Sequence, residues 1–134
     1  MIKILFDLKK EYYLNSLLPL YKAMAEDPSY ELSVRVGSDQ HRHLGIFLVS
    51  NRKRIEKDLE DAGFSVTGET RGFDGVVCGD ALKNPERYGD VPFFHRDHGV
   101  GIKTLRIRNI VRQRNARYHV FLEGRYWYDY IESL

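Results

Sequence analysis

Short apolar segments alternate with segments of helical periodicity along most of this chain. Residues 2–6 form an apolar run typical of a buried strand, and residues 31–36 alternate between apolar and polar side chains as a half-buried strand does. Between these segments, apolar side chains recur at the 3.6-residue spacing of a helix face, at Leu17, Leu18, Leu20, Tyr21 and Met24. A strand, a helix and a second strand in succession predict a crossover unit of a parallel sheet.

The rest of the chain continues this alternation. A helix is expected from Asn51, capped by that residue or by Ser50 and ended by Gly63. Further strands are expected at residues 64–67, 74–79, 91–95 and 118–122, and a final helix at residues 126–134. Residues 41–49 fit a strand or a helix, and that choice stays open.

The first helix is expected to begin at a cap formed by Asn15 or Ser16, because Pro19 then falls in its first turn. Together these elements predict one Rossmann-like α/β domain over residues 1–134, with a mostly parallel sheet of about six strands. The length of 134 residues suits a single domain, and a hydrophobic fraction of 43% excludes a disordered chain.

The sequence also excludes several classes of protein. The single cysteine, Cys78, cannot form an internal disulfide, and it lies within an apolar run that predicts a buried structural thiol. No apolar segment is long enough for a signal peptide or a membrane helix, so a cytoplasmic protein is expected. The chain has neither a Gly-x-Gly-x-x-Gly nor a Walker pattern, so no cofactor of the common nucleotide kinds is expected.

One loop has the composition of a binding or catalytic site. Ligands of parallel α/β sheets bind beyond the carboxyl ends of the strands, and residues 95–103 follow the strand expected at 91–95. A histidine there can act as a general base near neutral pH, glycines allow close approach of the backbone to an anion, and lysine can contact a phosphate. The candidate residues are His95, Asp97, His98, Gly99, Gly101 and Lys103.

The same loop allows two other interpretations. It could be a turn that needs its two glycines, flanked by surface charge. Alternatively, His95, Asp97 and His98 could join His41 and His43 in a metal site, but no spacing among them is specific for a metal, and no metal is expected. The loop that begins at Asp7, after the first strand, is a second candidate contact for substrate.

Positive charge is concentrated near the end of the chain. Residues 92–134 carry eight basic and four acidic side chains, and the segment from Lys103 to Arg117 carries no acid. Such a segment is either a solvated surface or a contact for an anionic partner. The aromatic side chains of residues 126–130 are interpreted as packing of the final helix, with base stacking as the alternative.

Two stretches of the sequence resemble a known group of enzymes. The order of elements, the opening Ile2-Lys-Ile-Leu-Phe and the helix Leu17-Leu-Pro-Leu-Tyr-Lys-Ala resemble the amino-terminal half of a GT-B glycosyltransferase. The spacing of His98, Gly99 and Lys103 is similar to the His-Gly-x-x-x-Lys stretch of the CDP-glycerol glycerophosphotransferase family, which builds teichoic acid and related surface polymers. That family usually has Trp before the His-Gly pair and Pro after it, where this chain has Asp97 and Val100.

The resemblance implies transfer of a glycerophosphate or glycosyl unit from a nucleotide-activated donor to an acceptor hydroxyl. His98 would be the catalytic base, and Gly99, Gly101 and Lys103 would line the cleft near the donor phosphates. GT-B enzymes hold the donor mainly in a second, carboxyl-terminal domain, so this domain is expected to be catalytically incomplete without such a partner. The basic segment would suit an anionic acceptor or peripheral contact with the inner face of the membrane.

Two alternatives stay open. A UDP-GlcNAc 2-epimerase shares the two-domain architecture and acts on its nucleotide sugar alone. A non-enzymatic module that binds nucleic acid or another anion through the basic segment is less favoured, and it would bind with an affinity that falls steeply with salt.

Overall fold

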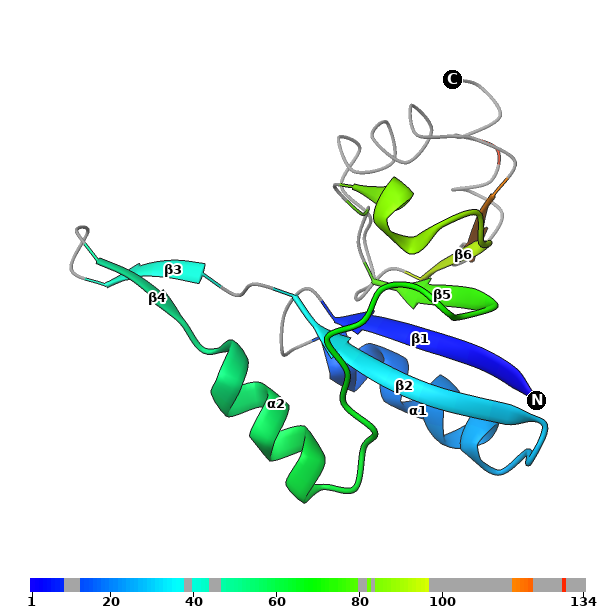
Figure 1. Ribbon diagram of the computed structural model, residues 1–134, viewed down its shortest axis with the longest axis horizontal. Helices are drawn as coiled ribbons and strands as arrows, with labels where there is room; N and C mark the ends of the chain where they lie inside the picture. The colour runs from blue at the N-terminus through cyan, green and yellow to red at the C-terminus, as the bar shows by residue number, and fades with distance from the viewer. Residues whose placement is uncertain are drawn as a thin grey trace.

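The computed structural model describes residues 1–8, 13–37, 40–43, 47–79, 82, 84–96, 117–121 and 129. Five strands form one sheet in which every neighbouring pair is parallel, in the order β2-β1-β5-β6-β7 (Figure 1). The strands are β1 (Ile2–Leu8), β2 (Tyr30–Val36), β5 (Gly75–Cys78), β6 (Phe93–Arg96) and β7 (Tyr118–Phe121). The Rossmann-like α/β fold predicted from the sequence is therefore confirmed.

Two helices cover one face of the sheet. Helix α1 (Tyr13–Ala25) lies behind β1 and β2 in Figure 1, and α2 (Arg52–Asp61) packs into the same core. Alternate residues of the strands point into this core, where Phe6 contacts Tyr21 of α1 edge to face at 5.2 Å between ring centroids. The side chains buried there are Ile4, Phe6, Leu8, Leu17, Leu32, Val34, Val36, Ile55, Leu59 and Val77.

A smaller core lies on the opposite face of the sheet. A short 3₁₀ helix, η1 (Pro85–Tyr88), follows β5 and precedes β6 in the sequence, and its Tyr88 side chain packs into this core. The ring of Tyr88 meets Phe93 of β6 at 90° and 5.9 Å between centroids. Leu5, Val76, Cys78 and Leu82 complete this core. The sequence analysis did not predict η1, because a single 3₁₀ turn has no periodicity that a pattern can reveal.

The strand expected at residues 64–67 is reduced to a single parallel bridge between Val66 and Val34 of β2. Val34 donates to the Ser65 carbonyl at 2.8 Å and accepts from Thr67 at 2.9 Å. Pairing ends there because the chain turns, with the Glu69 amide donating to the Thr67 hydroxyl at 3.1 Å. Counted with this bridge, the sheet follows the strand order 3-2-1-4-5-6 of Rossmann-like folds.

The start of the first helix was predicted wrongly. The helix begins at Tyr13, so Pro19 lies inside it and not in its first turn. Proline removes one backbone hydrogen bond of a helix interior. The apolar face of α1 outweighs that loss, because Leu17 is buried against the sheet while Pro19 is exposed. Burial of a leucine side chain contributes about 1.5–3 kcal/mol.

The other boundaries agree with expectation within a few residues. Asn51 occupies the N-cap position of α2, without a side-chain cap bond, and the chain leaves the helix through Gly63 at a φ of 86°. Of residues 41–49, left open above, 41–43 and 47–49 lie in two antiparallel strands, β3 (Gln40–His43) and β4 (Phe47–Ser50), which project beyond β2 in Figure 1. The final helix expected at residues 126–134 lies outside the described residues, except for Asp129. No helix in the described part of the chain is long and apolar enough to cross a membrane.

We predict that Gly75→Ala destabilises the fold. A Cβ at position 75 would lie 3.0 Å from Cε2 of Phe94 and 3.3 Å from Cδ1 of Ile4, so the tightly packed neighbours would have to move. Overpacking of this kind costs about 1–3 kcal/mol, measurable as a lower free energy of unfolding in urea.

Gly68→Ala is the matched control, because a Cβ there would have only the guanidinium of Arg52 nearby, at 3.9 Å. Equal stability of the two variants would contradict the packing described for β5.

Candidate functional site

A row of residues crosses the sheet near the carboxyl ends of its strands. Strand register pairs Arg35 of β2 with Asp7 of β1, Asp7 with Cys78 of β5, Cys78 with His95 of β6, and His95 with Val120 of β7. Paired residues of parallel strands point to the same face, here the face of η1. The strand order reverses direction between β1 and β5, which is where open α/β sheets bind their ligands.

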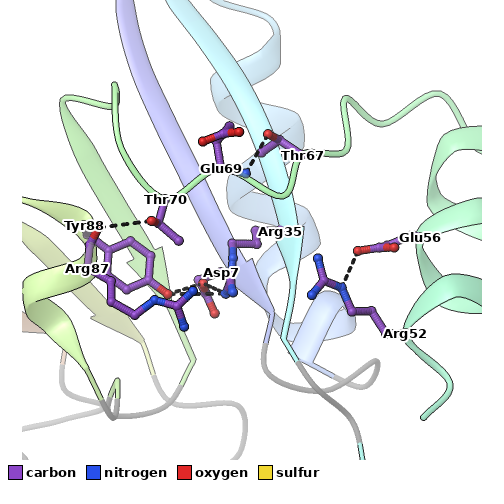
Figure 2. Close-up of polar contacts among 9 residues, drawn as sticks. All are labelled: Asp7, Arg35, Arg52, Glu56, Thr67, Glu69, Thr70, Arg87 and Tyr88. Atoms are coloured by element: carbon purple, nitrogen blue, oxygen red, sulfur yellow. Dashed lines mark hydrogen bonds and ion pairs between the residues drawn. The ribbon is translucent and has the colours of Figure 1, made fainter.

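Asp7 is the centre of a buried polar cluster (Figure 2). Its Oδ2 accepts a hydrogen bond from Nη1 of Arg35 at 2.8 Å and another from the hydroxyl of Tyr88 at 2.5 Å. The Arg35 Nη1 atom also lies 3.4 Å from the Tyr88 hydroxyl. Asp7 is only 4% exposed, so these two donors replace the water that a carboxylate would otherwise bind. We call Asp7, Arg35 and Tyr88 the Asp7 cluster.

Among the described residues, the Arg35 guanidinium donates hydrogen bonds through Nη1. Nη1 donates to Asp7, whereas Nε is buried and has no hydrogen-bond partner in the part of the chain that the structure describes. The side chain of Arg35 is 11% exposed. A buried donor without an acceptor costs about 1–3 kcal/mol, so the position is not optimised for stability alone.

Tyr88 stays a neutral donor at all physiological pH values. Burial raises the pKa of its hydroxyl well above the usual value of 10, and the negative charge and hydrogen bond of Asp7 raise it further. The positive charges of Arg35 and Arg87 oppose this shift. Arg87 is exposed, and its side chain extends beside the Tyr88 ring toward Asp7 in Figure 2. Its backbone carbonyl accepts a hydrogen bond from the Thr70 hydroxyl at 3.0 Å, which fixes η1 to the preceding loop.

Cys78 and His95 form a second buried pair in the row. The thiol sulfur lies 3.9 Å from Nδ1 of His95, and each residue is 1% exposed. The buried thiol expected from the sequence is thus confirmed. A weak S–H to imidazole contact orients the ring next to the carboxyl ends of β5 and β6.

The residues expected to form the site divide into two groups. Asp7 and His95 are described, and both lie in the row on one face of the sheet, two strands apart. The loop residues Asp97, His98, Gly99, Gly101 and Lys103 lie outside the described residues. Asp7 lies inside strand β1, not in the loop that follows it. The sequence analysis did not identify Arg35, Tyr88 or Arg87.

Among the described residues, no group of three or more His, Cys, Asp or Glu side chains is arranged to hold a metal ion. Comparison of the chain with protein-family models, curated proteins and solved structures finds no match. Function must therefore be inferred from the row of residues at the carboxyl ends of the strands, here called the carboxyl edge of the sheet, and from the sequence that follows it.

We predict that Tyr88→Phe changes how stability depends on pH above 10. Because the pKa of Tyr88 is raised on folding, the unfolded chain loses this proton first as pH rises. The stabilisation by Tyr88 is therefore complete below pH 10 and declines above it, by at most about 1.4 kcal/mol per pH unit. Urea unfolding of both proteins between pH 8 and 11 measures the difference.

At neutral pH the variant should be less stable by about 1–3 kcal/mol, because Asp7 loses a buried donor. That difference should shrink above pH 10. A difference that stays constant from pH 8 to 11 would contradict the raised pKa of Tyr88.

Proposed function

We propose that this domain is the acceptor-side half of a transferase that moves a glycerophosphate or glycosyl unit from a nucleotide-activated donor to a hydroxyl group. The surface polymers of the teichoic acid kind are the products that the resemblance of the His98 loop suggests. A second, nucleotide-binding domain would complete the enzyme. The alternative is an epimerase of the UDP-GlcNAc 2-epimerase kind, in which the same half closes over a nucleotide sugar.

One observation carries the proposal: the polar row lies at the position where the strand order reverses. Side chains at the carboxyl ends of β1, β5 and β6 change from apolar to polar there, at Asp7, Cys78 and His95. A substrate held over this edge would lie next to these buried polar side chains, at the end of a packed core. The candidate loop is joined to the same edge by the peptide bond after Arg96, the last residue of β6.

The chemistry assigns one step to His98. Its imidazole would take the proton of the acceptor hydroxyl as the acceptor oxygen forms a bond to phosphorus or to the anomeric carbon of the donor. The bond to the nucleotide breaks in the same step, and the nucleotide leaves with the electron pair. Lys103 would balance the charge on the donor phosphates, and Gly99 and Gly101 would leave room for them.

We predict that the chain binds CDP-glycerol at the carboxyl edge of the sheet. Titration with CDP-glycerol, CDP, UDP and UDP-GlcNAc, followed by amide NMR, should shift the signals of Gly79, Arg96 and residues 98–103. Residues at the amino ends of the strands, such as Lys3 and Glu31, serve as internal controls because the sheet separates them from this edge. Shifts confined to the amino ends would contradict the proposal. No response to any of the four compounds would mean either an acceptor-side half that needs its nucleotide-binding partner or a different family.

We further predict that His98→Ala lowers the rate of transfer by about 10²–10⁴-fold, the usual contribution of a general base. The rate is measured with the nucleotide-binding partner domain present. His119→Ala is the matched control, because His119 is an exposed histidine on β7 whose ring stacks on Phe94, on the face opposite Asp7. Near-normal transfer by a folded His98→Ala protein would remove His98 as the base. Conversion of UDP-GlcNAc into an epimerised nucleotide sugar without an acceptor would instead favour the epimerase, which is of the non-hydrolysing kind.

A further inference from the structure

In the Asp7 cluster, no described residue accepts a hydrogen bond from the Nε of Arg35. In a guanidinium, the Nε and Nη2 hydrogens form a planar fork that matches two oxygens of a phosphate or carboxylate. In Arg35, Nη1 alone donates to the cluster, Nε has no partner, and no hydrogen bond to the described residues uses Nη2. The fork is thus held in a fixed orientation by Asp7 and is not itself occupied.

A second guanidinium lies close to this edge. The charge of Arg87 acts on the hydroxyl of Tyr88, which is itself in contact with Asp7 and Arg35. Figure 2 shows its side chain extending from η1 toward the same carboxylate. Arg87 is exposed, and its guanidinium forms no ion pair or hydrogen bond with the described residues. Within the described residues, the hydrogen bond of Arg87 to a side chain is made by its backbone carbonyl, to Thr70.

The charges at this edge do not balance. Arg35 and Arg87 bring two positive charges, and Asp7 brings one negative charge that is already satisfied by two donors. An anion that accepts from the Nε–Nη2 edge of Arg35 and lies within reach of Arg87 would give the buried Nε an acceptor, and the excess of one positive charge would attract it. The cost of the unpartnered donor, which the folded protein carries without ligand, would then be recovered on binding.

We propose that Arg35 and Arg87 form a binding site for the phosphate monoester of a small ligand at the carboxyl edge of β1 and β2. A phosphate dianion fits this pair better than a carboxylate does. Its three terminal oxygens can accept hydrogen bonds from both guanidinium groups at once, whereas a single arginine fork uses both oxygens of a carboxylate. The excess of one positive charge also attracts a dianion more strongly than a monoanion. The site uses β1, β2 and η1, so it is distinct from the loop of His98 and would contact a different part of a substrate.

This site does not depend on the transfer reaction. It would hold the phosphate of an acceptor or donor if the proposed function is correct, and it would remain a phosphate site if that function is wrong. Binding of phosphate probes without transferase activity would therefore remove the function and keep the site.

The test is a titration of the whole chain at low ionic strength with glycerol 3-phosphate, inorganic phosphate and acetate. The side-chain Nε–H signal of Arg35 in a ¹H–¹⁵N spectrum reports directly on the atom in question, and calorimetry gives the affinities. The phosphate probes should shift this signal in a saturable way, and acetate should bind at least about tenfold more weakly. Arg87→Gln should lower the affinity for both phosphate probes by about tenfold, the effect expected when a charged hydrogen bond is lost.

Arg54→Gln is the matched control, because it removes the same charge from the exposed surface of α2. Its affinity should stay within about twofold of the original chain, since a distant exposed charge is screened. Arg35→Lys keeps the charge but loses the fork, and should weaken binding by about tenfold or more. If this variant does not fold, Arg87→Gln alone decides. An unshifted Arg35 signal, equal binding of acetate, or unchanged affinity in folded Arg87→Gln would each overturn the proposal.

Discussion

The burial of Asp7 is the constraint on which the carboxyl edge of the sheet depends. A carboxylate that is 4% exposed must be neutralised and hydrogen bonded, and its two partners come from segments 28 and 81 residues away in the sequence. Arg35 binds it from the neighbouring strand, and Tyr88 binds it from η1 across the face of the sheet. The same contacts therefore hold η1 over β1 and fix the orientation of both donors.

The two faces of the sheet differ in the side chains that they carry at the carboxyl ends of the strands. On the face covered by α1 and α2, the core stays apolar to the last residues of the strands, with Leu8 and Val36 both buried. On the face of η1, the side chains of β1, β5 and β6 change from apolar to polar within two residues. Leu5 is followed by Asp7, Val76 by Cys78 and Phe93 by His95, with all six side chains buried. Polar groups thus gather at one end of one face, which is the end where the topology favours a ligand.

The sequence predicted the fold well because the fold depends on local pattern. Five of the six expected strands are present, and the sixth is represented by the Val66 bridge. The start of α1 was wrong because Pro19 was given its usual first-turn position, whereas packing of Leu17 against the sheet outweighs one lost hydrogen bond.

The site was harder to predict, because it depends on contacts between distant segments. Asp7 was identified as an acid at the end of an apolar strand. Arg35 looked like the solvent side of an alternating strand, since Ser33 and Glu31 share its face. Tyr88 lies in a turn without periodicity. Only the pairing of β1 with β2, and the return of the chain over β1, shows that these three side chains meet.

Stability alone does not explain the Asp7 cluster. Replacement of a buried ion pair by well-packed apolar side chains is often neutral or stabilising, by about 1–4 kcal/mol in measured cases. Three apolar residues would also remove the unpartnered Nε of Arg35, whose burial costs free energy without ligand. The cluster is therefore better explained by the guanidinium that it holds in place for a ligand than by a contribution to the stability of the fold. It holds a guanidinium in a fixed orientation at the end of the sheet where polar side chains gather, with no acceptor for its Nε among the described residues, and Figure 2 shows the Arg87 side chain extending toward the same carboxylate.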